Sequence, residues 1–398
     1  MSSLATTLSD QMLTWLKSHE EEMFRLLESI VNIDSGSHCK RGVDRVNAVL
    51  RESLQSSGIT SSVLDLKNHG DCLLAEVPGS DTSNLPHALL LGHMDTVFPE
   101  GTAAARPYSV LDGVAHGPGV ADMKSGLVMN VFVARAFAEI EGNRGPVRIL
   151  FTSDEEIASP SSRPFILEYA RGAHTVLNPE AGRPNGNVVT ERKGAFFIDF
   201  EVQGIAAHSG VAHHAGASAI DALARKILAL HALTDPATGI TSNVGIVSGG
   251  VSANTVAPYA SAKLDVRFPN GVDVKSLHRK IHSIIEEESV PSTHGLATWE
   301  GSFSPLFQTA AGRDLLTDYI EAAMIAGLSV SGESTGGSAD SGLTASVGAP
   351  TLCATGPIGG NVHTEKEYCL LSTIVPRALA SALTVLKRDS CLRQDGVP

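Results

Sequence analysis

Three segments of the chain each begin with a mostly apolar run and end in a polar cluster. They lie at residues 88–95, 147–156 and 175–180 and read ALLLGHMD, VRILFTSDEE and TVLNPE. A strand with one wet face alternates between apolar and polar residues, whereas a strand covered on both faces is apolar throughout. Helix-like segments separate the three runs, so we expect an α/β fold with a mixed, largely parallel sheet flanked by helices. Ligands of such folds bind beyond the carboxyl ends of the strands, where these polar clusters lie.

The middle of the chain has a different pattern, which predicts a second domain. Apolar and polar residues alternate from Ile198 to Val202, and the order of strand-like and helix-like segments becomes β-α-β-β-α-β. This is the order of a ferredoxin-like α+β layer with its helices on one face. We therefore expect an inserted domain at 191–303 between two parts of the first domain, at 1–190 and 304–398. The length of 398 residues suits two domains.

Charge and cysteine content narrow the class of function. The formal net charge of −13 argues against a nucleic-acid partner, because nucleic-acid binding requires a basic face. The five cysteines form no Cys-x-x-Cys pair, and free thiols suit a reducing compartment.

Residues 1–33 lack the features of a signal peptide and are expected to form one amphipathic helix. No apolar run has the length of a membrane span, so we expect a cytoplasmic protein without a membrane partner.

Polar side chains that could bind a metal ion or transfer a proton follow the apolar runs or lie in Gly-rich loops. They are His93, Asp95, Asp122, Glu155, Glu156, Glu180 and His363. Taken singly, each has an ordinary explanation as surface polarity, a turn residue, a solvated strand end or a loop residue. Together, imidazole and carboxylate groups suit zinc, with Co²⁺ or Mn²⁺ also possible. Three carboxylates that converged without cations would repel one another and take up protons.

The stretches GHMDTVFPEGT, GPGVADMKSG, LFTSDEE, GIAAHSG and GPIGGNVHTEKEY together resemble a family of two-zinc peptidases. This family includes glutamate carboxypeptidase of the carboxypeptidase G type, acetylornithine deacetylase, succinyl-diaminopimelate desuccinylase and aminoacylase. The resemblance covers nearly the whole chain and is strongest to the glutamate carboxypeptidase branch. It implies a zinc exopeptidase type of fold, an inserted domain that acts as a lid, and a homodimer formed through that domain.

The resemblance also implies roles for the polar residues of the first domain. Two zinc ions per subunit would be held by His93, Asp122, Glu156, Glu180 and His363, with Asp122 bridging both ions. His93 and Glu180 would be the further ligands of one ion, and Glu156 and His363 would be the further ligands of the other. Relatives often have a Glu-Pro order where this chain reads Asn178-Pro179-Glu180. We assign Glu180, because an asparagine is a poor zinc ligand.

Two carboxylates would serve the reaction without binding an ion. Asp95 would orient the imidazole of His93 through a hydrogen bond, and Glu155 would be the general base. Adjacent residues of an extended chain point in opposite directions. On extended backbone, Glu156 could therefore face an ion while Glu155 faces the attacking water.

In the later part of the chain, the resemblance implies five residues that would contact the substrate. His208 would reach the active site of the partner subunit, although a surface turn histidine is the ordinary alternative. Arg267 would grip the substrate carboxylate with two parallel hydrogen bonds. Asn254 would assist the oxyanion or the carboxylate. The backbone N–H groups at Gly336 and Gly337 would bind the same carboxylate, unless this segment is only a flexible loop.

We therefore expect zinc-dependent hydrolysis of an amide bond in an N-acyl amino acid or small peptide with a free C-terminal carboxylate. Release of glutamate is the leading expectation. An N-acyl amino acid deacylase, of the aminoacylase or acetylornithine deacetylase kind, is the first alternative. A non-catalytic binding protein on the same scaffold is the second, although such a protein is expected to lack a ligand or the base.

Overall fold

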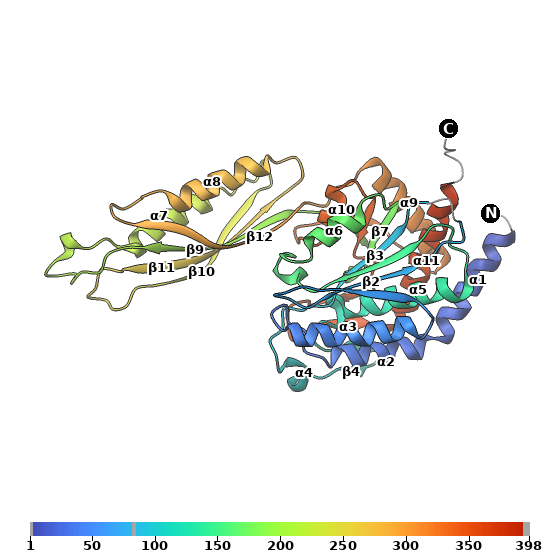
Figure 1. Cartoon of the computed structure of the whole chain (residues 1–398). Coiled ribbons are helices and arrows are strands. Elements are labelled where there is room, and N and C mark those ends of the chain that lie inside the picture. Colours follow the sequence, from blue (N-terminus) through green and yellow to red (C-terminus); the bar gives the residue numbers. More distant parts are fainter. Residues whose placement is uncertain (1–2, 82–84, 393–398) are drawn as a thin grey trace. The chain divides into compact units, whose positions relative to one another are not determined.

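The computed structural model describes residues 3–81 and 85–392 and divides into two compact units (Figure 1). The first, here called the main unit, comprises Met1–Glu191, Phe307–Thr335 and Ala339–Pro398. The second, here called the inserted unit, comprises Arg192–Leu306 together with the short segment Gly336–Ser338.

An eight-stranded sheet forms the centre of the main unit. In spatial order its strands are β1 (Thr60–Leu64), β2 (Cys72–Val77), β6 (Val147–Thr152), β3 (Ala88–His93), β7 (Thr175–Asn178), β14 (Thr351–Cys353), β8 (Val188–Arg192) and β13 (Gly332–Thr335). The neighbours β6, β3, β7 and β14 run parallel, whereas β1–β2, β2–β6 and β14–β8 are antiparallel pairs. The predicted mixed, largely parallel sheet is thus confirmed.

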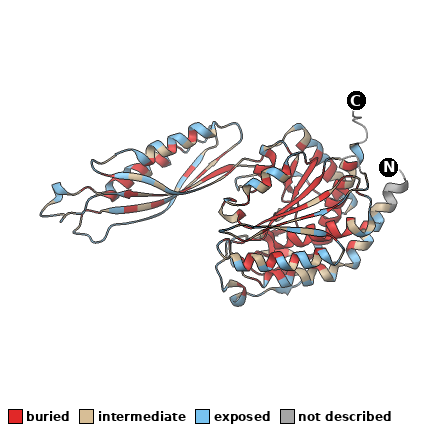
Figure 2. Cartoon of the chain, in the orientation of Figure 1, coloured by how far each residue is buried: buried red, intermediate tan, exposed pale blue. Residues whose placement is uncertain are grey.

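Helices cover both faces of this sheet, which explains why its central strands are apolar throughout. In β3, Leu90 belongs to a core with one set of helices, whereas Leu89 and Leu91 belong to a core with the other set. The first set is α1 (Ser3–Ser18), α2 (Glu20–Val31), α3 (Lys40–Gln55), α5 (Ser125–Ile140), α9 (Ala310–Ile325) and α11 (Ile374–Cys391). The second set is α6 (Arg163–Ala170) and α10 (Ser341–Ser346). Buried residues, red in Figure 2, accordingly fill the central strands and the helix faces turned toward them.

A smaller antiparallel sheet in the main unit joins segments that are far apart in the chain. Its order is β15 (Gly359–Gly360), β16 (Tyr368–Leu370), β5 (Val114–His116) and β4 (Ser109–Leu111). β16 pairs with β5 in the register Tyr368 opposite His116. This pairing brings the loop between β15 and β16 beside the segment that follows β5. Short elements complete the unit: α4 (Thr102–Ala105), η1 (Val120–Lys124), η2 (Glu155–Ile157) and η4 (Leu371–Thr373).

The inserted unit has the expected β-α-β-β-α-β order. It contains β9 (Gly194–Gln203), α7 (Ala219–His231), β10 (Thr241–Gly249), β11 (Tyr259–Phe268), α8 (Val274–Glu286) and β12 (His294–Phe303), with the short turn η3 (His213–Ala215) before α7. Its four strands form an antiparallel sheet in the order β10-β11-β9-β12. Alternate residues of β9, such as Ile198 and Phe200, share one core with residues of α7 and α8. Both helices therefore cover the same face of the sheet.

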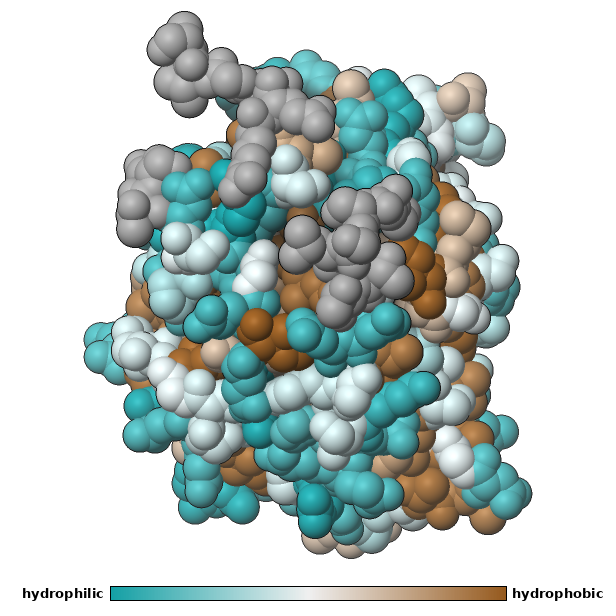
Figure 3. Space-filling model, turned by 90° about the vertical axis from the view of Figure 1, so that its right-hand side faces the viewer, coloured by the Kyte–Doolittle hydropathy of each residue, from teal (hydrophilic) through white to brown (hydrophobic). Residues whose placement is uncertain are grey.

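One local expectation is wrong. The N-terminal segment does not form a single helix, because α1 ends at Ser18 and α2 begins at Glu20. Within the described ranges, no helix is long and apolar enough to cross a membrane. On the face shown in Figure 3, hydrophilic residues are interspersed with smaller groups of hydrophobic ones.

Candidate metal centre

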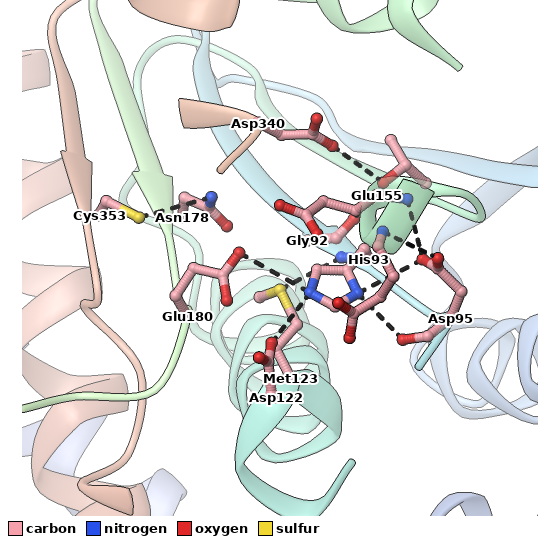
Figure 4. Close-up of polar contacts among 12 residues, drawn as sticks. Gly92, His93, Asp95, Asp122, Met123, Glu155, Asn178, Glu180, Asp340 and Cys353 are labelled. Carbon is pink, nitrogen blue, oxygen red and sulfur yellow. Dashed lines mark hydrogen bonds and ion pairs between the residues drawn. The ribbon is translucent and has the colours of Figure 1, made fainter. Parts of the chain in front are cut away.

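The polar residues after the central strands converge at one edge of the main sheet (Figure 4). β3 and β6 are parallel neighbours, and their last residues, His93 and Thr152, lie opposite each other in register. β7 is the parallel neighbour on the other side of β3 and ends at Asn178. Because parallel strands end at the same edge, the residues that follow β6 and β7 lie beside His93.

A first group of possible metal ligands consists of His93, Asp122 and Glu180, whose donor atoms all lie within 4.8 Å of one another. Nε2 of His93 is 3.2 Å from Oδ1 of Asp122 and 3.7 Å from Oε1 of Glu180. Asn178 points elsewhere, because its amide donates to Sγ of Cys353 at 3.7 Å. The structure thus brings Glu180, rather than Asn178, to the cluster.

A second group consists of Asp122, Glu156 and His363. Nε2 of His363 is 3.2 Å from Oδ2 of Asp122 and 3.3 Å from Oε2 of Glu156. Asp122 therefore offers one carboxylate oxygen to each group. The imidazole of His363 is 52% exposed, so the second group is open to solvent on that side. The backbone of His363 has φ +63°, a left-handed conformation that costs a non-glycine residue energy and is common at functional sites.

Glu155 is buried, and it belongs to neither group of possible ligands. The expected extended backbone at this pair is wrong, because Glu155 and Glu156 begin the 3₁₀ turn η2. The turn still gives the two side chains different surroundings, since only Glu156 approaches His363.

Asp95 holds this turn and the imidazole of His93 together. Its Oδ1 and Oδ2 accept hydrogen bonds from the main-chain N–H groups of Glu155 and Glu156, each at 3.1 Å. Oδ2 also accepts from Oγ of Ser37 at 2.6 Å. Nδ1 of His93 lies 3.0 Å from the carbonyl oxygen of Asp95 and 3.4 Å from its Oδ1. With Nδ1–H donating there, the Nε2 lone pair is free to face Asp122 and Glu180.

Two buried carboxylates near the groups were not among the predicted residues. Glu367 accepts hydrogen bonds from the N–H groups of Gly119, Ala121 and Asp122, and burial raises its pKa to about 7. Asp340 accepts from the hydroxyls of Ser159 and Thr152. Burial raises its pKa to about 7 as well. The sequence carries no signal that separates Glu367 from the exposed Glu365 two residues earlier.

The electrostatics of the groups favour a bound cation. Burial raises the pKa of Glu155 well above its usual range, and burial together with the charge of Asp122 raises that of Glu156 to about 7. Hydrogen bonds to Asp122 and Glu156 raise the pKa of His363 to about 10. The carboxylates therefore draw positive charge into this site, as a proton or as a metal ion that displaces it.

Two buried oxygens strengthen this conclusion. Oε1 of Glu156 and Oε1 of Glu180 make no hydrogen bond within the described ranges. A buried carboxylate oxygen without a partner is costly, and a divalent ion at each of the two groups would satisfy them. Imidazole and carboxylate donors are also the set that zinc and similar ions prefer. The residues present therefore fit metal ions.

A cavity of about 810 Å³ lies next to the second group. It is lined by residues 36–41 and 96–100 together with Glu156 and Ile157, all in the main unit. Its size is within the range of small-molecule sites.

His208 and Asn254 lie together on the inserted unit. His208 forms an isolated antiparallel β-bridge with Thr255. The N–H of Ser209 donates to the carbonyl oxygen of Asn254 at 2.9 Å. Nδ1 of His208 accepts hydrogen bonds from the N–H groups of Gly210 and Val211, each at 3.2 Å. The proton of the neutral ring is therefore on Nε2, and His208 is exposed.

Arg267 already has a carboxylate partner within the inserted unit. Its Nε and Nη2 donate to Asp265 at 2.6 and 2.7 Å, and Nη1 donates to Oγ of Ser338 at 3.1 Å. These contacts use three of the five guanidinium N–H groups. Gly336 and Gly337 belong to the same unit, and the carbonyl oxygen of Gly337 accepts from Arg192 at 3.3 Å.

Comparison with known proteins agrees with this geometry. A sequence model of the peptidase family M20/M25/M40 matches residues 89–387. The chain belongs to this family. The M20 family is metal-dependent, and all residues of both candidate ligand groups lie within the matched region. The chain is thus a hydrolytic enzyme of the peptidase and amidohydrolase type, and the family resemblance is confirmed.

Several relatives of this M20/M25/M40 peptidase are known. Carboxypeptidase G2 of Pseudomonas sp. (strain RS-16) is 29% identical over 380 residues, which cover 92% of this chain and 88% of that protein. Succinyl-diaminopimelate desuccinylase of Nitrosomonas eutropha is 27% identical over 76% of this chain and 83% of that protein. The solved M20 family metallo-carboxypeptidase Sso-CP2 from Sulfolobus solfataricus has a TM-score of 0.79 and 18% identity, covering 93% and 99% of the two chains. The last similarity concerns the fold.

Proposed function

We propose that this peptidase hydrolyses the amide bond of an N-acyl amino acid or small peptide with a free C-terminal carboxylate, with glutamate as the leading released amino acid. The observation that carries the proposal is the Asp122 carboxylate, which faces His93 with one oxygen and His363 with the other. The similarity to a carboxypeptidase over 92% of the chain supports the choice of substrate class.

Five residues would hold two zinc ions per subunit, with Co²⁺ or Mn²⁺ as alternatives: His93, Asp122, Glu156, Glu180 and His363. Asp122 would serve both positions, because each of its oxygens belongs to a different group. Bound ions would lower the pKa of a water molecule toward neutrality and polarise the substrate carbonyl.

Glu155 would move the proton during hydrolysis. It would take the proton from the attacking water and return it to the leaving nitrogen. Burial raises its pKa well above the usual range, which makes it a better base than an exposed glutamate. Asp95 would keep Glu155 in place, since it holds the N–H groups of the turn.

Residues of the inserted unit would bind the substrate. Arg267 would contact the free carboxylate with its two remaining N–H groups, assisted by the N–H groups at Gly336 and Gly337. Asn254 would assist the carboxylate or the oxyanion. His208 would donate from Nε2 to the oxyanion in the partner subunit's active site, because its Nδ1 already accepts two hydrogen bonds.

A homodimer through the inserted unit is part of this proposal. β10 is an edge strand, and an edge strand presents main-chain groups for pairing with another chain. Val247 on β10 is 55% exposed and Leu228 on α7 is 74% exposed. Apolar side chains beside an unpaired edge are suited to an interface.

The second candidate function is deacylation of N-acyl amino acids. It is favoured by the 27% identity to succinyl-diaminopimelate desuccinylase, and it uses the same chemistry with a different acyl group. A panel of N-acyl glutamates, folate-like compounds, N-acetyl amino acids and dipeptides would separate the two, with the released amino acid as the measured quantity.

The variant Glu155→Gln tests the proposed mechanism. We expect it to keep the wild-type metal content and to lose about 10²–10⁴-fold in kcat, because only the proton transfer is removed. Glu168→Gln, an exposed glutamate on α6 outside both groups and the cavity, is the matched control and should leave kcat unchanged. Wild-type kcat in metal-loaded Glu155→Gln would show that Glu155 is not the base.

A further inference from the structure

The inserted unit contains a third group of possible metal ligands, formed by His278, His282 and Glu300. His278 and His282 are four residues apart on α8, so they lie on the same face of the helix. Glu300 lies on β12, the edge strand beside this helix. The three donor atoms lie within 4.8 Å of one another, although they come from two different elements.

Each oxygen of the Glu300 carboxylate faces one imidazole. Nε2 of His278 is 2.9 Å from Oε2, and Nε2 of His282 is 2.8 Å from Oε1. The Nε2 atom of His282 is buried and makes no hydrogen bond within the described ranges, despite this short distance. The two atoms therefore approach at ion-pair distance without the geometry of a hydrogen bond. A cation that accepts the lone pair of Nε2 would satisfy both atoms.

The surroundings hold both rings in place. Nδ1 of His282 lies 3.4 Å from Oε1 of Glu286, one turn further along α8. A carboxylate on the second ring nitrogen is the common partner of a metal-bound histidine. The ring of His278 packs against Phe196 with centroids 5.1 Å apart, and against His282 with centroids 4.4 Å apart.

We propose that His278, His282 and Glu300 bind one additional zinc ion, separate from the groups in the main unit. This ion would cross-link α8 to β12. Two imidazoles and one carboxylate suit zinc, whereas calcium and magnesium prefer oxygen ligands. The imidazole of His278 is 38% exposed and Glu300 is 37% exposed, so an ion can enter and retain water as a further ligand. This site requires no part of the proposed hydrolytic mechanism.

Zinc stoichiometry of the full chain tests the proposal. Protein would be equilibrated with ZnCl₂, passed through a desalting column and analysed for zinc per subunit. Wild type should hold about one zinc equivalent more than His282→Ala, as expected for a single His₂Glu site. His294→Ala, an exposed histidine on the same strand as Glu300, is the matched control and should match wild type. Equal zinc content in wild type and folded His282→Ala would overturn the proposal.

Two further measurements cover the case in which His282→Ala fails to fold. His278→Gln removes the other imidazole and should show the same loss of one equivalent. Anomalous diffraction from zinc-soaked wild-type crystals should place a peak about 2.0–2.2 Å from the two Nε2 atoms and the Glu300 carboxylate. No peak there, with peaks at the main unit, would reject the third site and leave the proposed hydrolysis intact. Added zinc should also raise the Tm of wild type more than that of His278→Gln.

Discussion

Oε1 of Glu367 accepts a hydrogen bond from the main-chain N–H of Asp122 at 3.0 Å. The same carboxylate holds the N–H groups of Gly119 and Ala121, so it fixes the segment that carries the shared candidate ligand. Because this segment precedes α5 and Glu367 precedes β16, the bond joins two distant parts of the main unit.

Glu367→Gln should therefore weaken metal binding. A carboxylate accepts hydrogen bonds with both oxygens, whereas an amide has one acceptor oxygen and one NH₂ group. In the variant, the NH₂ group would face a main-chain N–H group, and two donors cannot form a hydrogen bond. We expect metal affinity to fall by about 10–100-fold, as is typical when an outer partner of a ligand is lost. Competition with a chromophoric chelator would measure it. Glu365→Gln, an exposed neighbour, should keep the wild-type affinity, and equal affinities in all three proteins would contradict the assigned role.

Asp95→Asn should lower kcat far more than Ser37→Ala. The asparagine would present NH₂ to the N–H of Glu155 or of Glu156, which displaces the turn that carries both. Ser37→Ala removes only the 2.6 Å hydrogen bond from its hydroxyl, worth about 1.5–3 kcal/mol because the acceptor is a carboxylate. Steady-state kinetics at saturating metal concentration would compare the kcat values of the two variants. A larger loss in Ser37→Ala would mean that Asp95 does not organise the turn.

The convergence of His93, Glu156 and Glu180 was predictable, because each follows an apolar strand and parallel strands end at one edge. His363 could be placed only through the family resemblance, since the pairing of β16 with β5 that positions its loop joins remote segments. Glu367 was missed because a buried carboxylate that accepts N–H groups looks like any other glutamate in sequence. The ion pair between Asp265 and Arg267 could have been predicted from the sequence. The two residues are two positions apart on a strand, so their side chains lie on the same face.

Arg267→Ala and Asp265→Asn should change KM in opposite directions. Loss of Arg267 removes the proposed carboxylate contact and should raise KM by about 10–100-fold, with a smaller change in kcat. Asp265→Asn leaves the guanidinium with an unneutralised charge, which should lower KM for a substrate with a free carboxylate. A substrate capped as the C-terminal amide is the control, because its KM should respond weakly to both variants. A raised KM in Asp265→Asn would show that Asp265 is needed to position the arginine.

Asp340→Asn should change how stability depends on pH. Burial raises the pKa of Asp340 from 3.8 to about 7, so between these values the folded state holds a proton that the unfolded state has lost. Folding stability of wild type therefore falls as pH rises through this window, by about 4 kcal/mol at most from this residue, and stays constant above it. The asparagine cannot ionise, and it can still bond the hydroxyls of Ser159 and Thr152.

Urea denaturation at fixed zinc concentration would measure this effect. The stability of Asp340→Asn relative to wild type should increase from pH 4.5 to pH 7.5. Asp314→Asn, an exposed aspartate, should show the wild-type pH profile. Parallel profiles for Asp340→Asn and wild type would mean that Asp340 ionises normally in the folded protein.

The proposed dimer predicts that Leu228→Glu is monomeric and poorly active. A charge at this 74% exposed position would be buried by an interface through the inserted unit but would be harmless on a free surface. Sedimentation velocity and kcat would be measured together. Met324→Glu, a 62% exposed position on α9 of the main unit, is the control and should retain the wild-type mass and kcat.

Mixing two inactive variants tests whether His208 serves the partner subunit. In a mixed dimer of His208→Ala and Glu155→Gln, one active site would combine Glu155 of the first subunit with His208 of the second. Unfolding and refolding an equimolar mixture should therefore restore about a quarter of the wild-type activity, since random pairing makes half of the dimers mixed and each mixed dimer has one complete site. If His208 instead acted within its own subunit, no site in any dimer would hold both residues, and the mixture would stay as inactive as its components.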